Sequence, residues 1–273
     1  MISIKNLKHY YTDADGNEVR ALDGVSLEIK QGEFVAVIGA NGSGKSTLAR
    51  HLNALLLPTD GTVLVDGMDT EDESKMWDIR QKVGMVFQNP DNQLFLESVR
   101  KEFEFGPHQI GMSATQIRER MSWVAELMGL SDKLDDNPAD LSPVEKKFCA
   151  MGTVIMMNPG VVVLDEPTCG QDVTGEQRLS HAIQALREQG TLCVTISHDT
   201  KFVTKNFPRT VVLCQGRVID QGPTDDVFTH VDVLKQSFVI PPPVARVARA
   251  AGMRRVAFTV DQLIANITEE REA

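Results

Sequence analysis

A glycine-rich segment from Gly39 to Ser46 constrains the fold of this chain more than any other part of the sequence. It reads GANGSGKS and matches the pattern G-x-x-x-x-G-K-[ST] in full. The apolar run Phe34 to Ile38 precedes it, and an apolar-periodic segment, Leu48 to Leu57, follows it up to Pro58. These flanks predict a buried strand, a loop and a helix, the arrangement in which such a loop wraps around phosphate groups.

The residue types of this loop suit a bound nucleoside triphosphate. Glycines let several backbone N–H groups converge on phosphate oxygens, and the following helix presents its positive end to them. We expect the Lys45 ammonium to reach the β- and γ-phosphates and the Ser46 hydroxyl to ligate Mg²⁺. The predicted phosphate-binding residues are Gly39, Asn41, Gly42, Ser43, Gly44, Lys45, Ser46 and Thr47.

An acidic pair further along the chain points to hydrolysis as well as binding. The run Val161 to Leu164 is typical of a buried strand, and Asp165 and Glu166 follow it directly. Acidic pairs at strand ends also cap helices, but the phosphate loop in the same chain favours a catalytic interpretation. Asp165 is then expected in the Mg²⁺ shell, with Glu166 polarising the attacking water.

The remaining apolar pattern indicates an α/β fold. Several short runs are almost continuously apolar and valine-rich, as in strands buried on both faces of a parallel sheet, and helical patterns separate them. We therefore predict a P-loop NTPase core of the RecA-like type with a mainly parallel sheet. The predicted strands are residues 25–29, 34–38, 83–87, 161–164, 192–196 and 211–213.

Two segments interrupt or follow this core. Between residues 91 and 160 the strand pattern disappears, and a helix face follows the capping box Ser113-x-x-Gln116. After residue 230 the chain turns proline-rich at 241–243 and then basic. We predict a nucleotide-binding core at 1–90 and 161–230, a helical subdomain at 91–160 and a C-terminal extension at 231–273.

The basic residues of the extension have two interpretations. Their charge fits a solvated helix face or a docking surface, and the sequence leaves both open. They are Arg246, Arg249, Arg254 and Arg255.

Charge and cysteine content exclude several other classes of protein. The 273 residues carry a net charge of −10, the wrong sign for a surface that tracks nucleic acid. The four cysteines are widely spaced, which favours reduced, buried thiols over disulfides or a zinc site. Neither an apolar leader at the N-terminus nor a run of about 18 apolar residues is found, so we expect a cytosolic chain or one held at a membrane by others.

The order of these motifs resembles that of an ABC-transporter nucleotide-binding domain. The resemblance implies ATP as the nucleotide and an antiparallel β part at the N-terminus. It also implies that Gln88 contacts Mg²⁺, the attacking water and the membrane partner, and that His198 contacts the γ-phosphate. Asp172 is then expected at a dimer interface, and Tyr11 stacked on adenine, with Tyr10 as a rival.

A narrower resemblance covers nearly the whole chain. The stretch Val86 to Phe95, the later Phe105 to Pro107 and the extension after Phe228 are similar to the ATPases of energy-coupling factor (ECF) importers. This implies a peripheral subunit at the cytoplasmic face of the cell membrane. Its expected partners are a second ABC ATPase, a transmembrane coupling protein and membrane-embedded substrate-binding subunits for vitamins or transition-metal ions.

One motif departs from the family. Its signature LSGGQ falls at residues 141–145, which here read LSPVE, so that only Leu141 and Ser142 remain. In the family this serine and the following N–H groups grip the γ-phosphate bound to the opposite subunit. Pro143 has no N–H, Val144 adds bulk and Glu145 adds negative charge, yet the three residues start a helix well, as a capping box.

The departure predicts an asymmetric pair of ATPases. Because each site joins the P-loop of one subunit to the signature of the other, a partner with an intact signature would complete a competent site on this chain. A homodimer, with both sites defective, stays open. So do a catalytically idle regulatory ABC subunit and a non-transport soluble ABC ATPase acting on DNA or the ribosome, the last disfavoured by length and composition.

Overall fold

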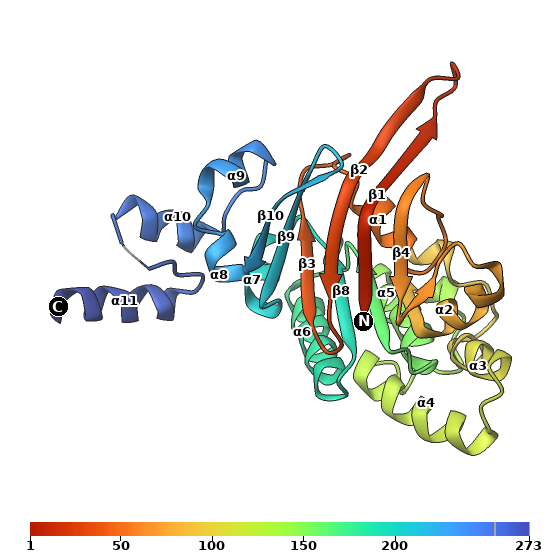
Figure 1. The fold of residues 1–273 in the computed structure, drawn as a ribbon. Helices are drawn as coiled ribbons and strands as arrows, with labels where there is room; N and C mark the ends of the chain where they lie inside the picture. The colour runs from red at the N-terminus through yellow and green to blue at the C-terminus, as the bar shows by residue number, and fades with distance from the viewer. Residues whose placement is uncertain (254, 273) are drawn as a thin grey trace.

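A computed structural model describes residues 1–253 and 255–272, and its strands form two sheets (Figure 1). The smaller, N-terminal sheet is antiparallel, with strand order β2-β1-β4-β5. It confirms the antiparallel part implied by the family resemblance. Its strands are β1 (Ile2–Thr12), β2 (Glu18–Ile29), β4 (Asp60–Val65) and β5 (Met68–Asp69).

The second sheet forms the centre of the molecule. Its order is β10-β9-β3-β8-β7-β6, and every pairing is parallel except that of β10 with β9. All residues of β3, β7 and β8 are buried, as the valine-rich runs predict. The strands are β3 (Phe34–Ile38), β6 (Val83–Val86), β7 (Val161–Asp165), β8 (Leu192–Ile196), β9 (Arg209–Cys214) and β10 (Arg217–Pro223).

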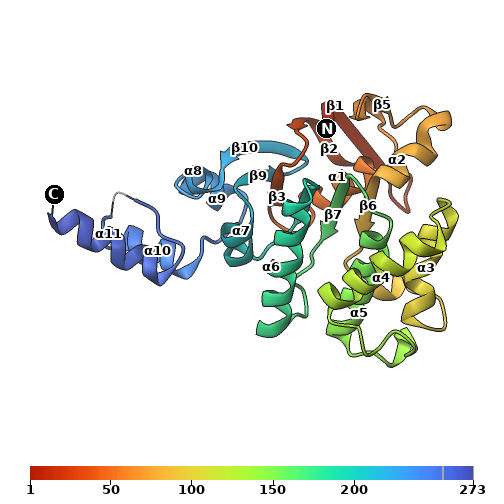
Figure 2. The same cartoon turned by 90° about the horizontal axis from the view of Figure 1, so that it is seen from below.

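Some helices cover the central sheet, and others form a separate group beside it. Figure 2 shows α3, α4 and α5 gathered together, with α6 between them and the C-terminal helices. The three helices of residues 91–160 pack on one another, and the described part of that segment contains no strand. The helices of the first 230 residues are α1 (Lys45–Leu52), α2 (Met76–Lys82), α3 (Val99–Gln109), α4 (Ala114–Met128), α5 (Pro143–Met156), α6 (Val173–Glu188), α7 (Thr200–Asn206) and α8 (Thr224–Val227), with short 3₁₀ turns at Glu73–Lys75, Pro90–Asn92 and Pro138–Asp140.

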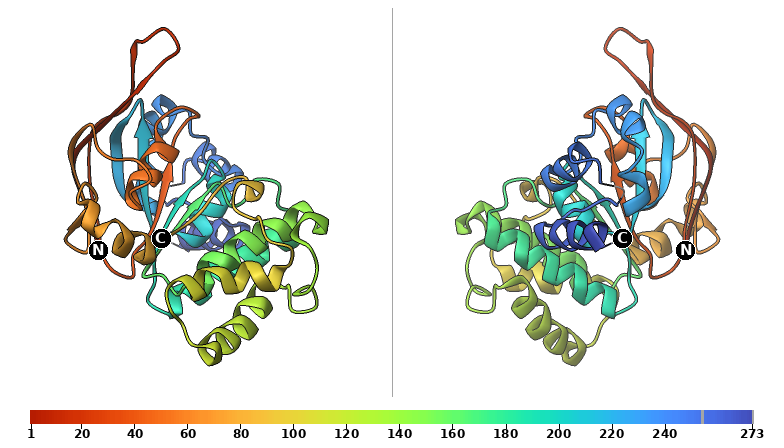
Figure 3. Two further views of the ribbon diagram at one scale, coloured as in Figure 1. Left: turned by 90° about the vertical axis from the view of Figure 1, so that its right-hand side faces the viewer. Right: turned by 90° about the vertical axis from the view of Figure 1, so that its left-hand side faces the viewer.

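The C-terminal residues add three helices at one end of the molecule: α9 (Val231–Gln236), α10 (Pro243–Ala250) and α11 (Val260–Glu272). Helices α10 and α11 extend away from the sheets (Figures 1 and 2), and in the right-hand view of Figure 3 they lie in front of the rest of the molecule, whereas α9 stays against the core through the buried Leu234. Arg246 and Arg249 lie exposed on α10, and Arg255 pairs with Glu269 of α11. Arg254, predicted to belong to the same basic group, lies outside the described residues.

Two sequence expectations need correction. The helix after the phosphate loop ends at Leu52 rather than near Leu57, because the Leu55 N–H donates to the Arg50 carbonyl and Ala54 adopts a left-handed φ of 54°. This closes a Schellman turn without glycine. The cysteines are all free, but burial is only half right: Cys149 and Cys193 are buried, with thiol pKa values raised by desolvation to about 12, whereas Cys169 is exposed.

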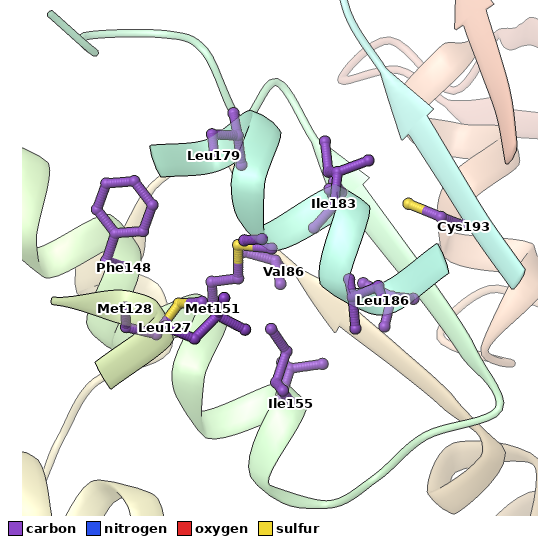
Figure 4. Close-up of a cluster of buried hydrophobic side chains, with 14 of the residues drawn as sticks. Val86, Leu127, Met128, Phe148, Met151, Ile155, Leu179, Ile183, Leu186 and Cys193 are labelled. Carbon is purple, nitrogen blue, oxygen red and sulfur yellow. The ribbon is translucent and has the colours of Figure 1, made fainter. Parts of the chain in front are cut away.

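A hydrophobic cluster joins the helical segment to the sheet (Figure 4). Phe148, Met151 and Ile155 of α5 face Leu179 and Ile183 of α6 across this cluster, and β6 and β8 contribute further side chains to it. Apolar burial of this kind is the main stabilising contribution to such a contact. The start of α5 is thereby held rigidly to the elements that carry the acidic pair.

The Ile155 side chain is fully buried in this cluster, whereas Ile240 is 68% exposed. We expect Ile155→Ala to lower the free energy of unfolding by about 2–5 kcal/mol, because it leaves a cavity, and Ile240→Ala to change it by less than about 0.5 kcal/mol. Urea unfolding of the two variants measures both values. Equal losses for the two would contradict the assignment of this cluster as the core.

Candidate functional site

The phosphate loop leaves β3 at the carboxyl edge of the central sheet and enters α1 at Lys45. Two of its glycines leave no room for a side chain. A Cβ on Gly39 would lie 2.1 Å from the carbonyl oxygen of Leu213, and Gly44 combines a φ of 103° with a Cβ position 2.5 Å from the Ala21 carbonyl oxygen. Neighbouring backbone therefore fixes the path of the loop.

The basic and hydroxyl groups of the loop point inward. Lys45 is buried, and its Nζ donates to the carbonyls of Gly39 and Ala40 at 2.9 and 2.8 Å. Desolvation lowers the pKa of this ammonium, while Glu166 and Asp165 oppose the shift. The ammonium thus lies within electrostatic reach of Asp165, the predicted Mg²⁺ ligand, and Glu166, the predicted catalytic carboxylate.

The acidic pair ends β7, next to the loop. The Ser46 hydroxyl donates to Oδ1 of Asp165 at 3.2 Å, which brings together two of the predicted Mg²⁺ ligands. Burial raises the pKa of Asp165, while the bond from Ser46 opposes that shift. A nearby cation would restore the charged form of this carboxylate.

Glu166 and His198 form a second pair. Nδ1 of His198 lies 2.8 Å from Oε2 of Glu166, and the His198 backbone N–H donates to the same oxygen at 3.3 Å. The Glu166 carboxylate is nearly buried while the histidine side chain is 64% exposed. Glu166 also has a left-handed φ of 49°, a rare conformation for a non-glycine residue, at the sharp turn after β7.

Gln88 lies near this pair. It is exposed just beyond β6, and it lines a small cavity together with Glu166 and Lys147. Lys147, on α5, is a residue that sequence analysis missed. Its ammonium donates to the Cys169 carbonyl, and burial lowers its pKa. Its position, two residues after the LSPVE segment, carries no motif that would have revealed this contact.

Tyr11 lies on β1 with its side chain toward α1. Its hydroxyl and that of Thr47 are 3.2 Å apart, and the ring is 38% exposed. Tyr10 lies instead below the guanidinium of Arg20, 5.5 Å from the ring centroid. Of the two rivals, Tyr11 is therefore the one beside the phosphate loop.

The LSPVE segment forms the capping box that its sequence predicts. The Ser142 hydroxyl accepts the Glu145 N–H at 3.3 Å, and the Glu145 carboxylate accepts the Ser142 N–H at 2.9 Å. Lys133 pairs with this carboxylate at 2.9 Å. Hydrogen bonds from Lys133 and then Ser142 lower the pKa of Glu145 to about 2, so the group is negative at neutral pH.

The structure does not bring every predicted residue to one place. Ser142 caps α5, and Asp172 caps α6 by accepting the Gly175 N–H at 2.7 Å. Both bonds are local to their own helices. Within one chain, these two residues do not join the cluster around Lys45, in keeping with roles that the family resemblance assigns to a facing subunit.

Two further residues fix the segment after Gln88, and no sequence motif flagged their contacts. The Gln93 amide donates to the Ala150 carbonyl at 2.7 Å and to the Thr153 hydroxyl at 2.9 Å, both on α5. The buried Glu102 accepts the Leu96 N–H at 2.6 Å. The loop that begins at Gln88 is thus fastened to the helix that begins with LSPVE.

The donor set fits a nucleotide with Mg²⁺. Within 1–253 and 255–272, no cluster of three or more His, Cys, Asp or Glu side chains is arranged to hold a metal. Mg²⁺ needs fewer protein ligands, because phosphates and water complete its octahedron, and Ser46 with Asp165 supplies hard oxygens. The buried Ser43 hydroxyl has no hydrogen-bond partner among the described residues and suits a phosphate oxygen.

The parallel sheet, the phosphate loop at its edge and the adjacent carboxylates define a P-loop ATPase. The chain belongs to the ABC transporter family, whose model matches residues 22–169. The family resemblance predicted from the motifs is confirmed, as is the α/β fold. No described helix is long and apolar enough to cross a membrane.

Its relatives narrow the resemblance to importers of the ECF class. The ECF transporter ATP-binding protein EcfA2 of Clostridium perfringens is 39% identical over all of this chain and 96% of its own length. EcfA1 of Symbiobacterium thermophilum is 42% identical over 89% of this chain and 87% of its own length. The cobalt import ATP-binding protein CbiO of Syntrophus aciditrophicus is 38% identical over 86% of this chain and 83% of its own length.

Solved structures agree with this placement. The cbiO1 protein of Clostridium perfringens, part of the transporter complex cbiONQ, superposes with a TM-score of 0.76 at 31% identity, covering 92% of this chain and 98% of that one. The ATP-binding cassette MJ0796, solved as a dimer bound to ADP and Pi, superposes with a TM-score of 0.75 at 28% identity. The match covers 82% of this chain and 99% of that one.

The close approach of backbone at Gly39 predicts a sharp contrast between two loop glycines. Gly39→Ala would push into the Leu213 carbonyl, whereas a Cβ on Gly42 meets nothing within 4 Å, although its φ is also positive. We expect Gly39→Ala to weaken ATP binding at least about a hundredfold and Gly42→Ala by about tenfold or less, since the latter adds only backbone strain. Titration with a fluorescent ATP analogue measures both, and similar losses for the two variants would refute the account of the loop.

Proposed function

We propose that the chain is the ATP-hydrolysing subunit of an ECF-type importer, in which its own P-loop site is the competent one. The pairing of an intact hydrolytic cluster with a self-capped LSPVE segment carries this proposal. Lys45, Asp165, Glu166 and His198 are all present and close together. At the start of α5, by contrast, Pro143 offers no N–H and the Glu145 N–H is bonded to the Ser142 hydroxyl.

The cluster suits attack of water on the γ-phosphate. Glu166 accepts a proton from the attacking water, and His198 holds the acceptor oxygen and reaches toward the phosphate. Lys45 and the loop N–H groups stabilise the charge that develops on the phosphate oxygens. Ser46, Asp165 and Gln88 would hold Mg²⁺, which would neutralise charge on the phosphate oxygens. Tyr11 would stack on the adenine.

The LSPVE segment is poorly suited to a partner's γ-phosphate. Pro143 offers no N–H, and the Glu145 carboxylate is charged at neutral pH. Loss of one charged hydrogen bond costs about 1.5–3 kcal/mol, and a carboxylate near phosphate adds repulsion. A rate about a hundredfold lower or more follows for the site that this segment completes.

A partner ATPase with an intact signature therefore fits better than a second copy of this chain, in which both sites would carry the weak segment. The cassette MJ0796, solved as a dimer bound to ADP and Pi, supports pairing of two such ATPases. The ECF and cobalt-import relatives support a transmembrane coupling protein, substrate-binding membrane subunits and a peripheral position at the cytoplasmic face. Vitamins or transition-metal ions are the expected cargo, and nucleic acid is not an expected partner.

A second candidate function is a regulatory subunit that binds ATP without turning it over. The altered signature favours it, since Glu145 replaces the phosphate-binding end of the motif. The Glu166–His198 pair, in which Nδ1 of His198 lies 2.8 Å from Oε2 of Glu166, argues for turnover instead. Hydrolysis by the assembled complex separates the two functions.

Glu166→Gln tests which site performs the work. We expect this variant to bind ATP normally and to lose about a hundredfold or more of transport activity, because the amide cannot accept the proton from water. Glu188→Gln, at the exposed end of α6, is the matched control and should transport normally. Normal transport by Glu166→Gln would show that this site is not the working one.

Rebuilding the signature tests the other half of the asymmetry. The triple variant Pro143→Gly, Val144→Gly, Glu145→Gln should raise the ATPase rate of the complex about twofold, as a second site starts to turn over at a comparable rate. Glu145→Gln alone, which keeps the proline, should raise it less. Uptake does not require the change, and an unaltered ATPase rate in a well-folded triple variant would count against the proposed defect.

A further inference from the structure

A cluster of two histidines links Tyr11 to the phosphate-loop helix, and neither has a part in the chemistry described above. His9 lies on β1, two residues before Tyr11, so both side chains are on the same face of the strand. His51 lies on α1, four residues after Thr47 and therefore one turn further along the helix. His51 is fully buried and His9 is 9% exposed.

His9, Tyr11, Thr47 and His51 form a closed set of contacts. The His9 ring packs edge-on against Tyr11 and against His51, with ring centroids 4.7 Å apart in both pairs. Nδ1 of His51 lies 2.8 Å from the Thr47 carbonyl, and the Thr47 hydroxyl contacts the Tyr11 hydroxyl. Each member is thus held by two others.

The protonation of His51 follows from its surroundings. Burial first, and then the neighbouring His9, lower the pKa of the His51 imidazole, so the ring is neutral at pH 7. A neutral ring donates from only one nitrogen. Nδ1 lies 2.8 Å from the Thr47 carbonyl and Nε2 lies 3.2 Å from the Leu57 carbonyl, and we assign the proton to Nδ1 because its distance is shorter. Nδ1 of His9 lies 3.2 Å from the Leu57 carbonyl, which ties the chain after α1 into the same cluster.

We propose that His9 and His51 are positioning residues that hold the Tyr11 ring against α1 at the orientation needed to stack on adenine. The inference rests on the proposed adenine-binding role of Tyr11. Tyr11 belongs to β1 and the phosphate loop belongs to the other sheet, and the histidines join the two. Without them the Tyr11 hydroxyl would retain one contact to Thr47, and the ring would be free to rotate about it.

The proposal predicts that variants of this cluster lose affinity for the adenine base and keep their affinity for the phosphates. We expect His9→Ala to weaken ATP binding about fivefold, because an edge-on aromatic contact is lost, and to leave the affinity for inorganic triphosphate unchanged. His9→Phe retains a ring and should bind ATP within about twofold of the parent chain. His181→Ala, at an exposed histidine of α6, is the control and should match the parent chain.

Fluorine NMR gives a readout that a general loss of stability would not produce. The chain has two tyrosines, so 3-fluorotyrosine labelling gives two resonances, which the Tyr10→Phe variant assigns. In His9→Ala the Tyr11 resonance should move and the Tyr10 resonance should remain. Thermal unfolding checks that each variant is folded.

The outcomes separate the two claims. Equal losses for ATP and triphosphate, no loss in His9→Ala, or as large a loss in His9→Phe would each overturn the positioning role. Tyr11→Ala provides the reference. If that variant binds ATP as tightly as the parent chain, the adenine-binding role of Tyr11 fails, whereas a loss in Tyr11→Ala without one in His9→Ala defeats the positioning role alone.

Discussion

The parallel register of β3, β8 and β7 is the constraint on which the rest of the site depends. Val37 pairs with Ile196, and Ile196 pairs with Asp165, so the three strands end at one edge of the sheet. The phosphate loop, the Glu166 turn and the His198 turn all begin there. A one-residue shift in register would move every side chain of these buried strands to the opposite face and disrupt the packing on both, so the register is fixed. The groups at the strand ends are held in place for the same reason.

The same rigidity reaches the start of α5 through the buried cluster that α5 and α6 share. There the sequence satisfies the helix end by itself: Ser142 and Glu145 bond to each other, and Lys133 pairs with the carboxylate. A helix N-terminus that begins with a proline, bonds its Glu145 N–H to its own cap and carries a carboxylate in the first turn has lost much of what attracts phosphate. Local stability and binding to a partner's nucleotide therefore oppose each other at this segment, and an asymmetric complex resolves the conflict.

The sequence predicted those parts of the fold whose physical signals are local. Continuous valine runs marked β3, β7 and β8, and the capping boxes at Ser113 and Ser142 marked two helix starts. The end of α1 was missed because a left-handed Ala54, rather than glycine, closes it. The contacts of Gln93, Glu102 and Lys147 were missed as well, since each depends on helices that only the tertiary structure brings together. The roles of the predicted site residues stay predictions, although the structure does gather most of them.

The stoichiometry of a single turnover tests the central claim most directly. The tagged chain, purified with its partners from membranes of its own host, is loaded with radiolabelled ATP without Mg²⁺, mixed rapidly with Mg²⁺ and quenched. The account predicts that about half of the bound ATP becomes ADP in a fast phase, with the remainder turning over about a hundredfold more slowly. Equal, fast conversion of all bound ATP, or no fast phase, would contradict the asymmetric pair.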